Sequence, residues 1–226
     1  MAETKKIIME ETLAQQMAAQ LRRPSGEAGV QTGEWMNRGN VHMNKDTLEI
    51  LNAAANDTIL EIGMGNGFFV KDILQKDPSI KYTGCDFSEV MVAEAQKLNA
   101  AWINKGQAKF ICADVADMPF ADGSFNKIFT INTIYFWEDA TAILAQLKRV
   151  LKKNGTLIIS LRPKHLMQGY PFTKYGFTLF AKADVVHLLE ANGFTIVQAF
   201  EKPEPDFDLN GEIIKMESLV ILATCK

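Results

Sequence analysis

The chain has 226 residues, 47% of them hydrophobic and 23% charged, which is typical of a folded globular protein and excludes a disordered, collagen-like or coiled-coil chain. Its 24 basic and 27 acidic residues give a net charge of −3, which argues against a sequence-independent nucleic-acid-binding protein because phosphates attract a basic surface. No apolar run reaches the roughly 18 to 20 residues of a membrane span, and the N-terminus lacks the apolar stretch of a secretory signal. We therefore expect a cytoplasmic protein with no nucleic-acid partner and no membrane span.

The three cysteines, Cys85, Cys112 and Cys225, are an odd number and include no C-x-x-C pair. This pattern indicates neither a disulfide framework nor a zinc site, and no metal is expected. Each cysteine lies in or beside an apolar, strand-like run, so we expect three small buried thiols.

The first 44 residues differ in character from the rest of the chain. Apolar residues recur at helical spacing over 7–22, from Ile7 to Leu21, and predict a helix that Pro24 ends. Residues 24–44 are rich in Gly and Asn and are expected to be irregular, with one helical turn near Trp35. A second helix is predicted over 45–54.

The remainder of the chain alternates between strands and helices. Strands are predicted at 58–62, 80–85, 109–112, 126–131, 156–161, 194–200 and 218–225, and helices at 66–75, 89–103, 138–151 and 183–191. Ser88 is a candidate N-cap for the second of these helices, and Asn154-Gly155 is a candidate end for the third. The alternation predicts an α/β fold with a doubly wound, mainly parallel sheet, whose last two strands pair antiparallel because no helix separates them.

A glycine-rich turn follows the first strand. Gly63, Gly65 and Gly67 precede a predicted helix, so a ligand can approach the backbone there, at the carboxyl ends of the strands. The dinucleotide fingerprint requires a third glycine at the position of Phe68, so the pattern matches that fingerprint only in part. The alternative is a tight connection without a ligand.

Acidic residues end the next two strands. Asp86 is placed to accept hydrogen bonds from two ribose hydroxyl groups; its alternative role is a helix cap, but Ser88 takes that role and leaves Asp86 free. Asp114 is placed to accept a hydrogen bond from an exocyclic amine such as that of adenine, and its alternative role is to form a turn. Gly, Asp and Asp at three strand ends together predict a nucleoside-binding site.

These segments, taken in order, resemble the class I S-adenosylmethionine-dependent methyltransferases, close to the type 11 and ubiquinone- and menaquinone-biosynthesis group. The likeness covers about residues 45–226 and is carried by Leu60–Gly67, Gly84–Ser88, Ala113–Val115, Met118–Phe120, Asp122–Phe125 and Arg149–Gly155. It implies a Rossmann-like sheet of seven strands with a C-terminal antiparallel hairpin, S-adenosyl-L-methionine as cofactor and a small-molecule acceptor. Asn154 departs from the family, which often has proline there.

The resemblance also implies roles for single residues around the cofactor. Glu61 would orient its amino-acid end, Asp86 would hold the ribose, and Asn132 would lie beside the sulfonium. The other expected cofactor-binding residues are the turn residues Gly63, Met64, Gly65 and Gly67, the adenine-flanking Phe87 and Met91, and Asp114 with the Val115 N–H at the adenine edge.

The acceptor site is expected above the strand ends, under a lid formed by residues 1–44, with the cofactor domain spanning 45–226. The alternative for the N-terminal segment is a structural strap that packs on the sheet and stabilises it. Candidate acceptor-binding residues are Trp35, Asn40, Tyr135 and Trp137, although aromatic residues after a strand also pack in cores. His42, Tyr135 and His165 are candidate catalytic bases, although a lone histidine is more often structural. Arg162 and Lys164 are expected to be solvated.

The sequence thus predicts an enzyme that transfers a methyl group from S-adenosylmethionine to a small molecule by in-line displacement. One alternative is an NAD-dependent oxidoreductase of related fold, which the displaced third glycine disfavours. The other is a non-catalytic, cofactor-binding regulatory subunit, which the same residues would also fit. The acceptor, its nucleophilic atom, the need for a general base and the oligomeric state stay open.

Overall fold

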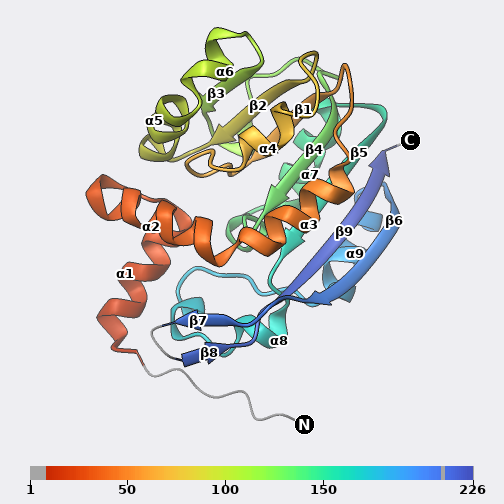
Figure 1. Cartoon of the computed structure of the whole chain (residues 1–226). Helices are drawn as coiled ribbons and strands as arrows, with labels where there is room; N and C mark the ends of the chain where they lie inside the picture. Colours follow the sequence, from red (N-terminus) through yellow and green to blue (C-terminus); the bar gives the residue numbers. More distant parts are fainter. Residues whose placement is uncertain (1–8, 210–211, 226) are drawn as a thin grey trace.

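The computed structural model describes residues 9–209 and 212–225, and its centre is a seven-stranded sheet (Figure 1). The strands are β1 (Thr58–Ile62), β2 (Lys81–Asp86), β3 (Ala108–Cys112), β4 (Phe125–Ile131), β5 (Leu151–Leu161), β6 (Phe194–Pro203) and β9 (Glu217–Cys225). They lie in the order β3-β2-β1-β4-β5-β9-β6. Strands β1 to β5 pair in parallel, and β9 is antiparallel to both β5 and β6. The predicted doubly wound sheet and its antiparallel C-terminal pair are confirmed.

Helices cover both faces of this sheet. Those on one face are α3 (Val41–Leu51), α4 (Val70–Leu74) and α5 (Glu89–Leu98), followed by the short α6 (Ala100–Asn104); those on the other are α1 (Glu11–Arg22), α7 (Ala140–Val150) and α9 (Lys182–Ala191). Consecutive residues of a strand point to opposite faces, so Ile59 packs in the first core and Leu60 in the second. Both layers are needed because a parallel sheet is apolar on both faces.

The order of the strands reverses beside β1. Strand β2 pairs with one edge of β1 and β4 with the other. The chain therefore leaves β1 towards one side of the sheet and leaves β4 towards the opposite side. Ligands of such sheets bind in the crevice at the carboxyl ends of the strands, where the order reverses. The glycine-rich turn after β1 lies at this point.

Residues 24–44 are helical, so the prediction of an irregular segment is wrong. Helix α2 (Gly26–Gly39) fills most of the segment, and α3 begins at Val41, inside the predicted 1–44 lid. Two of its glycines allow close packing. A β-carbon on Gly29 would lie 2.8 Å from the Pro24 carbonyl carbon, and a β-carbon on Gly33 would lie 3.2 Å from the Met91 sulfur. Figure 1 shows α1 and α2 beside the sheet, with α3 running back along it.

Other element boundaries also differ from the prediction. The helix predicted over 89–103 is broken at Asn99, whose amide donates to the carbonyl groups of Gly67 and Ala95. Helix α7 ends at Val150, before the predicted stop, and Asn154 lies inside β5 with a φ of 62°. The predicted helix over 66–75 is reduced to α4, and the predicted start at Ile7 lies outside the described residues, where α1 begins at Glu11.

Several smaller elements were not predicted. They are α8 (Lys164–Met167), the single-turn helices η1 (Val115–Asp117), η2 (Ile134–Phe136) and η3 (Pro171–Lys174), and a ribbon of β7 (Phe207–Leu209) and β8 (Glu212–Ile214). The prediction of three buried thiols is wrong for Cys112, which is exposed at the end of β3, whereas Cys85 and Cys225 are buried.

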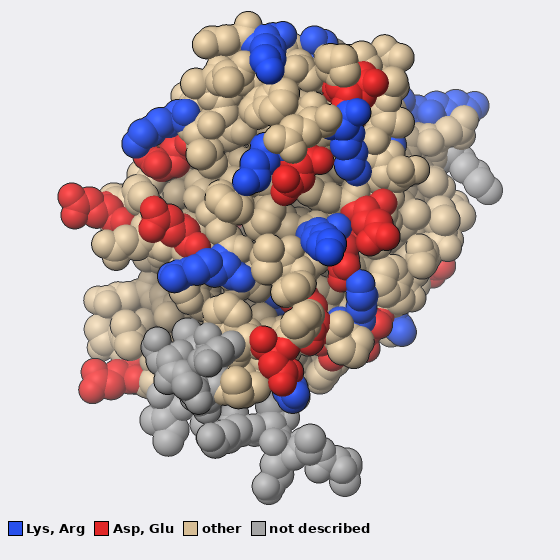
Figure 2. Space-filling view, viewed as in Figure 1, with Lys and Arg blue, Asp and Glu red and all other residues tan. Residues whose placement is uncertain are grey.

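The described surface is mixed in charge. On the face shown in Figure 2, basic and acidic side chains are interspersed and do not gather into a region of one sign. Among the helices that the structure describes, none combines the length and the apolar character that crossing a bilayer requires.

Replacing Leu144 by alanine should lower the free energy of unfolding by about 2 to 5 kcal/mol, because its side chain is fully buried where α7 meets the sheet. Denaturant unfolding followed by circular dichroism measures the change. Leu98→Ala is the matched control, since Leu98 is 56% exposed and should change stability by less than about 0.5 kcal/mol. Equal losses in the two variants would contradict the assignment of the core.

Candidate functional site

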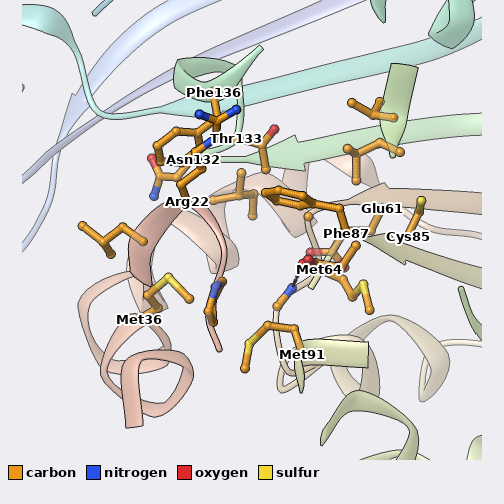
Figure 3. Close-up of a pocket in the computed structure, with 18 of the residues that line it drawn as sticks. Arg22, Met36, Glu61, Met64, Cys85, Phe87, Met91, Asn132, Thr133 and Phe136 are labelled. Carbon is orange, nitrogen blue, oxygen red and sulfur yellow. Dashed lines mark hydrogen bonds between the residues drawn. The ribbon is translucent and has the colours of Figure 1, made fainter. Parts of the chain in front are cut away.

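A cavity of about 390 Å³ lies at the carboxyl ends of β1, β2 and β4 (Figure 3). Its walls come from the glycine-rich turn, the residues that follow β2, β3 and β4, the start of α7, and the α1–α2–α3 segment. The volume lies within the range of small-molecule and cofactor sites. Because segments distant in sequence enclose it, the cavity depends on the whole fold.

The glycine-rich turn forms the floor of the cavity. Gly63, Gly65 and Gly67 have φ values of 69°, 57° and 68°, in the left-handed region that favours glycine. A β-carbon on Gly63 would lie 2.2 Å from the Thr133 methyl carbon, whereas one on Gly65 would have no neighbour within 4 Å. The turn therefore passes tightly against the residues that follow β4 and leaves open space above Gly65.

Glu61 is a buried carboxyl group in the cavity wall. It is 7% exposed, and its Oε2 accepts a hydrogen bond of 2.5 Å from the Tyr82 hydroxyl. Burial raises the pKa of Glu61 to about 7; the Tyr82 hydrogen bond lowers this pKa and the nearby Asp86 carboxylate raises it. A cationic group of a ligand beside Glu61 would favour its ionised form.

Asp86 is the second buried carboxyl group. Its Oδ1 accepts from the Ser88 N–H at 2.9 Å and its Oδ2 from the Gly65 N–H at 3.1 Å. Ser88 caps α5, accepting from the Met91 N–H at 3.2 Å, so Asp86 is not the helix cap, as predicted; two backbone N–H groups nevertheless occupy part of its acceptor capacity. Each carboxylate oxygen can accept a further hydrogen bond, so Asp86 can still bind two hydroxyl groups. Burial raises its pKa to about 6, against the lowering effect of these N–H groups.

The end of β3 supplies a more exposed part of the wall. Asp114 accepts from the Ala116 N–H at 2.9 Å and so caps η1, which is the turn-forming role given above as its alternative. Asp114 also lines the cavity. Phe87 also lines the cavity, with the Arg23 guanidinium 5.4 Å from the centre of its ring.

All eleven residues expected to bind the cofactor line this one cavity. They are Glu61, Gly63, Met64, Gly65, Gly67, Asp86, Phe87, Met91, Asp114, Val115 and Asn132. The structure therefore brings together every position that the family resemblance selected, and the individual roles stay predictions.

The four candidate acceptor-binding residues divide into two pairs. Asn40 and Trp137 line the cavity, whereas Trp35 and Tyr135 are not part of its wall. The Trp137 indole nitrogen is buried without a hydrogen-bond partner among the described residues. Tyr135 is buried in the core, where its hydroxyl oxygen accepts from the Arg162 N–H at 2.5 Å. Burial raises the pKa of Tyr135, so this hydroxyl is poorly placed to act as a base.

The two candidate histidine bases lie away from the cavity. His42 borders a separate groove between α3 and the end of β6, together with Asp46 and Lys202. His165 is exposed on α8, and its Nε2 lies 2.7 Å from Glu217 Oε2. Neither ring is among the residues that line the cavity.

Arg162 is buried, so the prediction that it is solvated is wrong. It is 4% exposed and forms an ion pair with Glu204, which the turn after β6 brings to it. The partner lies 42 positions further along the chain, so sequence reasoning could not assign it. Lys164 is exposed, as expected.

Sequence reasoning missed several residues of the lid wall. On α2 and α3 they are Gly33, Asn37 and Asn44, which with Met36 and the predicted Asn40 recur at helical spacing. The signal was present, but reading 24–44 as irregular concealed it. Arg22, at the end of α1, also lines the cavity and pairs with Glu138 at 2.5 Å.

The comparisons with known proteins agree with this geometry. Residues 60–159 match the methyltransferase domain family. The chain is 27% identical over 125 residues to uncharacterized methyltransferase YdaC of Bacillus subtilis, covering 55% of this chain and 67% of YdaC. It is 35% identical over 107 residues to the ubiquinone/menaquinone biosynthesis C-methyltransferase UbiE of Geotalea daltonii, covering 47% of this chain and 46% of UbiE.

A solved structure extends the likeness beyond these segments. The SAM-dependent methyltransferase from Aquifex aeolicus superposes with a TM-score of 0.67 at 16% identity, covering 97% of this chain and 100% of that chain. At this identity the likeness establishes the fold. The family resemblance drawn from the motifs is confirmed by the domain match and by the relatives.

Replacing Gly63 by alanine should destabilise the ligand-free protein more than replacing Gly65 by alanine. Both substitutions strain a left-handed backbone, but the Gly63 β-carbon would also collide with Thr133. Thermal unfolding of the two variants measures the difference, and Gly63→Ala/Thr133→Ser should recover part of it. Equal melting temperatures for the two single variants would contradict this close approach.

The free energy of unfolding should depend on pH through Glu61. Its folded pKa of about 7 lies above the unfolded value of 4.5, so the folded state binds the extra proton and loses stability as pH rises across this interval. Glutamine does not titrate, so the Glu61→Gln variant does not lose stability in this way. Its free energy of unfolding minus that of the parent should therefore increase by about 2 to 3 kcal/mol from pH 5 to pH 8.

Urea unfolding at each pH measures this difference in stability. Glu190→Gln, at an exposed position on α9, is the control and should leave the pH dependence of the parent unchanged. A pH-independent difference between Glu61→Gln and the parent would show that Glu61 titrates normally.

Proposed function

We propose that this chain is an S-adenosylmethionine-dependent methyltransferase that transfers a methyl group from S-adenosylmethionine to a small organic acceptor. The observation that carries the proposal is the convergence of Glu61, the glycine-rich turn, Asp86 and Asp114 on one cavity. The chain covers less than half of UbiE, so its own activity and acceptor are proposals.

The residues present fit the cofactor. Open space above Gly65 lets a ligand lie against the backbone, and Asp86 retains acceptor capacity for a pair of ribose hydroxyls. Glu61, buried and with a raised pKa, is suited to hold the cationic amino group of an amino acid. Asp114 and Val115 border the same space and are available to an adenine ring.

Once bound, S-adenosylmethionine supplies an electrophilic methyl group on a sulfonium, which is a good leaving group. The protein then has to align the acceptor and exclude water. Met36, Phe136 and Trp137 give the cavity wall an apolar part, and Asn37 and Asn40 give it neutral hydrogen-bonding groups. We infer that catalysis rests on alignment and desolvation of the acceptor.

Residues 1–44 act in this proposal as the lid, in front of a cofactor domain that spans 45–226. Within the described part of the lid, Gly33 of α2 lies against Met91 of α5, and Met36 and Asn37 complete the cavity wall. A lid of this kind would exclude water during transfer. Helix α1 also buries Ala14 and Ala18 in the core, so the lid contributes to stability as well.

Asp86→Asn should weaken the binding of S-adenosylhomocysteine about 10- to 150-fold, because a charge-assisted hydrogen bond contributes about 1.5 to 3 kcal/mol. The neutral amide keeps the shape of the side chain, and isothermal titration calorimetry measures the affinity. Asp122→Asn is the control, since Asp122 is exposed, pairs with Arg149 and lies outside the cavity. Unchanged affinity in folded Asp86→Asn would refute the ribose assignment.

A metabolite screen distinguishes the proposed enzyme from its alternatives. Incubation with S-adenosylmethionine carrying a deuterated methyl group, followed by mass spectrometry of a metabolite extract, should reveal a product heavier by that methyl group. Binding of S-adenosylhomocysteine without any labelled product would favour the regulatory subunit. Binding of NAD in place of S-adenosylhomocysteine would favour the oxidoreductase.

A further inference from the structure

Helix α2 is held at both of its ends by hydrogen bonds with buried groups. At its start, the Ser88 hydroxyl donates to the Pro24 carbonyl oxygen at 2.5 Å. Nearby, Arg22 pairs with Glu138, and these two side chains are 42% and 84% exposed. Exposed ion pairs contribute little to stability. The end of α2, the Gly39–Asn40 elbow that leads into α3, is held by buried groups.

A buried arginine anchors the elbow. Arg162 Nη2 donates to the Gly39 carbonyl oxygen at 3.0 Å, and its Nη1 donates to the Glu217 carbonyl oxygen at 3.0 Å. Its guanidinium pairs with Glu204, and these two side chains are 5% and 2% exposed. Glu204 also accepts a hydrogen bond from the Ser218 hydroxyl. The charge is therefore compensated, and the guanidinium connects the elbow to the ends of β5, β6 and β9.

The same network reaches the cavity. Asn132 Nδ2 donates to Asn40 Oδ1 at 3.1 Å, and both residues line the cavity wall. Asn132 follows β4 with a φ of 58°, and its Oδ1 lies 3.1 Å from the Tyr135 hydroxyl. That hydroxyl in turn contacts both the N–H and the carbonyl oxygen of Arg162. These contacts run from Arg162 through the elbow, Asn132 and Tyr135 back to Arg162, so each group restrains the position of the next.

We propose that Arg162 is a positioning residue for methyl transfer: it fixes the Gly39–Asn40 elbow so that the Asn40 and Asn132 amides meet at the acceptor end of the cavity. The part that concerns the acceptor rests on the proposed function. The part that concerns the elbow does not, because the contacts between Arg162, Gly39 and Glu204 require no ligand.

Hydrogen–deuterium exchange of the ligand-free protein tests the elbow directly. Arg162→Gln combined with Glu204→Gln neutralises both charges together and so avoids leaving one of them buried and unpaired. In this double variant, amides of residues 36–48 should exchange at least about tenfold faster, while amides of α7 and the unfolding midpoint stay near those of the parent. Parental exchange over 36–48 in a folded double variant would overturn the proposal.

Two further variants sharpen the test. Arg162→Lys keeps a charge beside Glu204, but one ammonium group does not span both Glu204 and the Gly39 carbonyl oxygen, so exchange at 36–48 should be intermediate. If the double variant does not fold, this lysine variant decides, and parental exchange in it overturns the proposal. Lys215→Gln is the control: it breaks an exposed 2.7 Å pair with Asp206, outside the measured segment, and should leave the elbow unchanged.

A kinetic measurement separates positioning from a general structural role. With an acceptor identified by the metabolite screen, the double variant should show a KM for the acceptor raised about tenfold or more, while the dissociation constant of S-adenosylhomocysteine stays within about threefold of the parent. Equal weakening of both ligands would contradict positioning at the acceptor end. Failure of the parent to bind S-adenosylhomocysteine would instead refute the proposed function and leave the exchange test intact.

Discussion

Where β1 ends, the backbone of Gly63 passes so close to the segment after β4 that a β-carbon would lie 2.2 Å from the Thr133 methyl carbon. This contact sets the geometry of the cavity. It turns the chain sharply at the point where the strand order reverses, and it places the Gly65 N–H against Asp86 at the end of β2. The cavity floor, the position of the Asp86 carboxylate and the start of the next helix all follow from that turn.

The same site holds groups that are unfavourable in the absence of a ligand. Burial raises the pKa values of Glu61 and Asp86 to about 7 and about 6, so ionising either group in the empty cavity costs free energy. A ligand that brings a cationic group to one and hydroxyl donors to the other offsets that cost. Affinity for the cofactor and stability of the ligand-free protein are therefore opposed at these two positions, as is common in functional sites.

The features predicted from the sequence were those that local patterns encode. Apolar strand runs predicted the sheet, and the glycine spacing and the acidic strand ends predicted a ligand site at Gly63–Gly67, Asp86 and Asp114. The other expected cofactor positions came from the family resemblance, and all of them line the cavity. The lid was misread because Gly29 and Gly33 usually favour loops, whereas here they allow α2 to pack against Pro24 and Met91. Arg162 was misassigned because its partner Glu204 is brought close only by the folded C-terminal strands. Contacts between distant segments leave no periodic signal in one sequence.

In the proposed enzyme, the cavity at the β1–β4 switch point binds the nucleoside and amino-acid parts of one cofactor. A crystal structure of the protein grown with S-adenosylhomocysteine tests it most directly. The account predicts ligand density above Gly65, with both ribose hydroxyls on Asp86, the amino group beside Glu61 and the sulfur on the side of Asn132. Density for the ligand in any other place, or with the ribose away from Asp86, would contradict it.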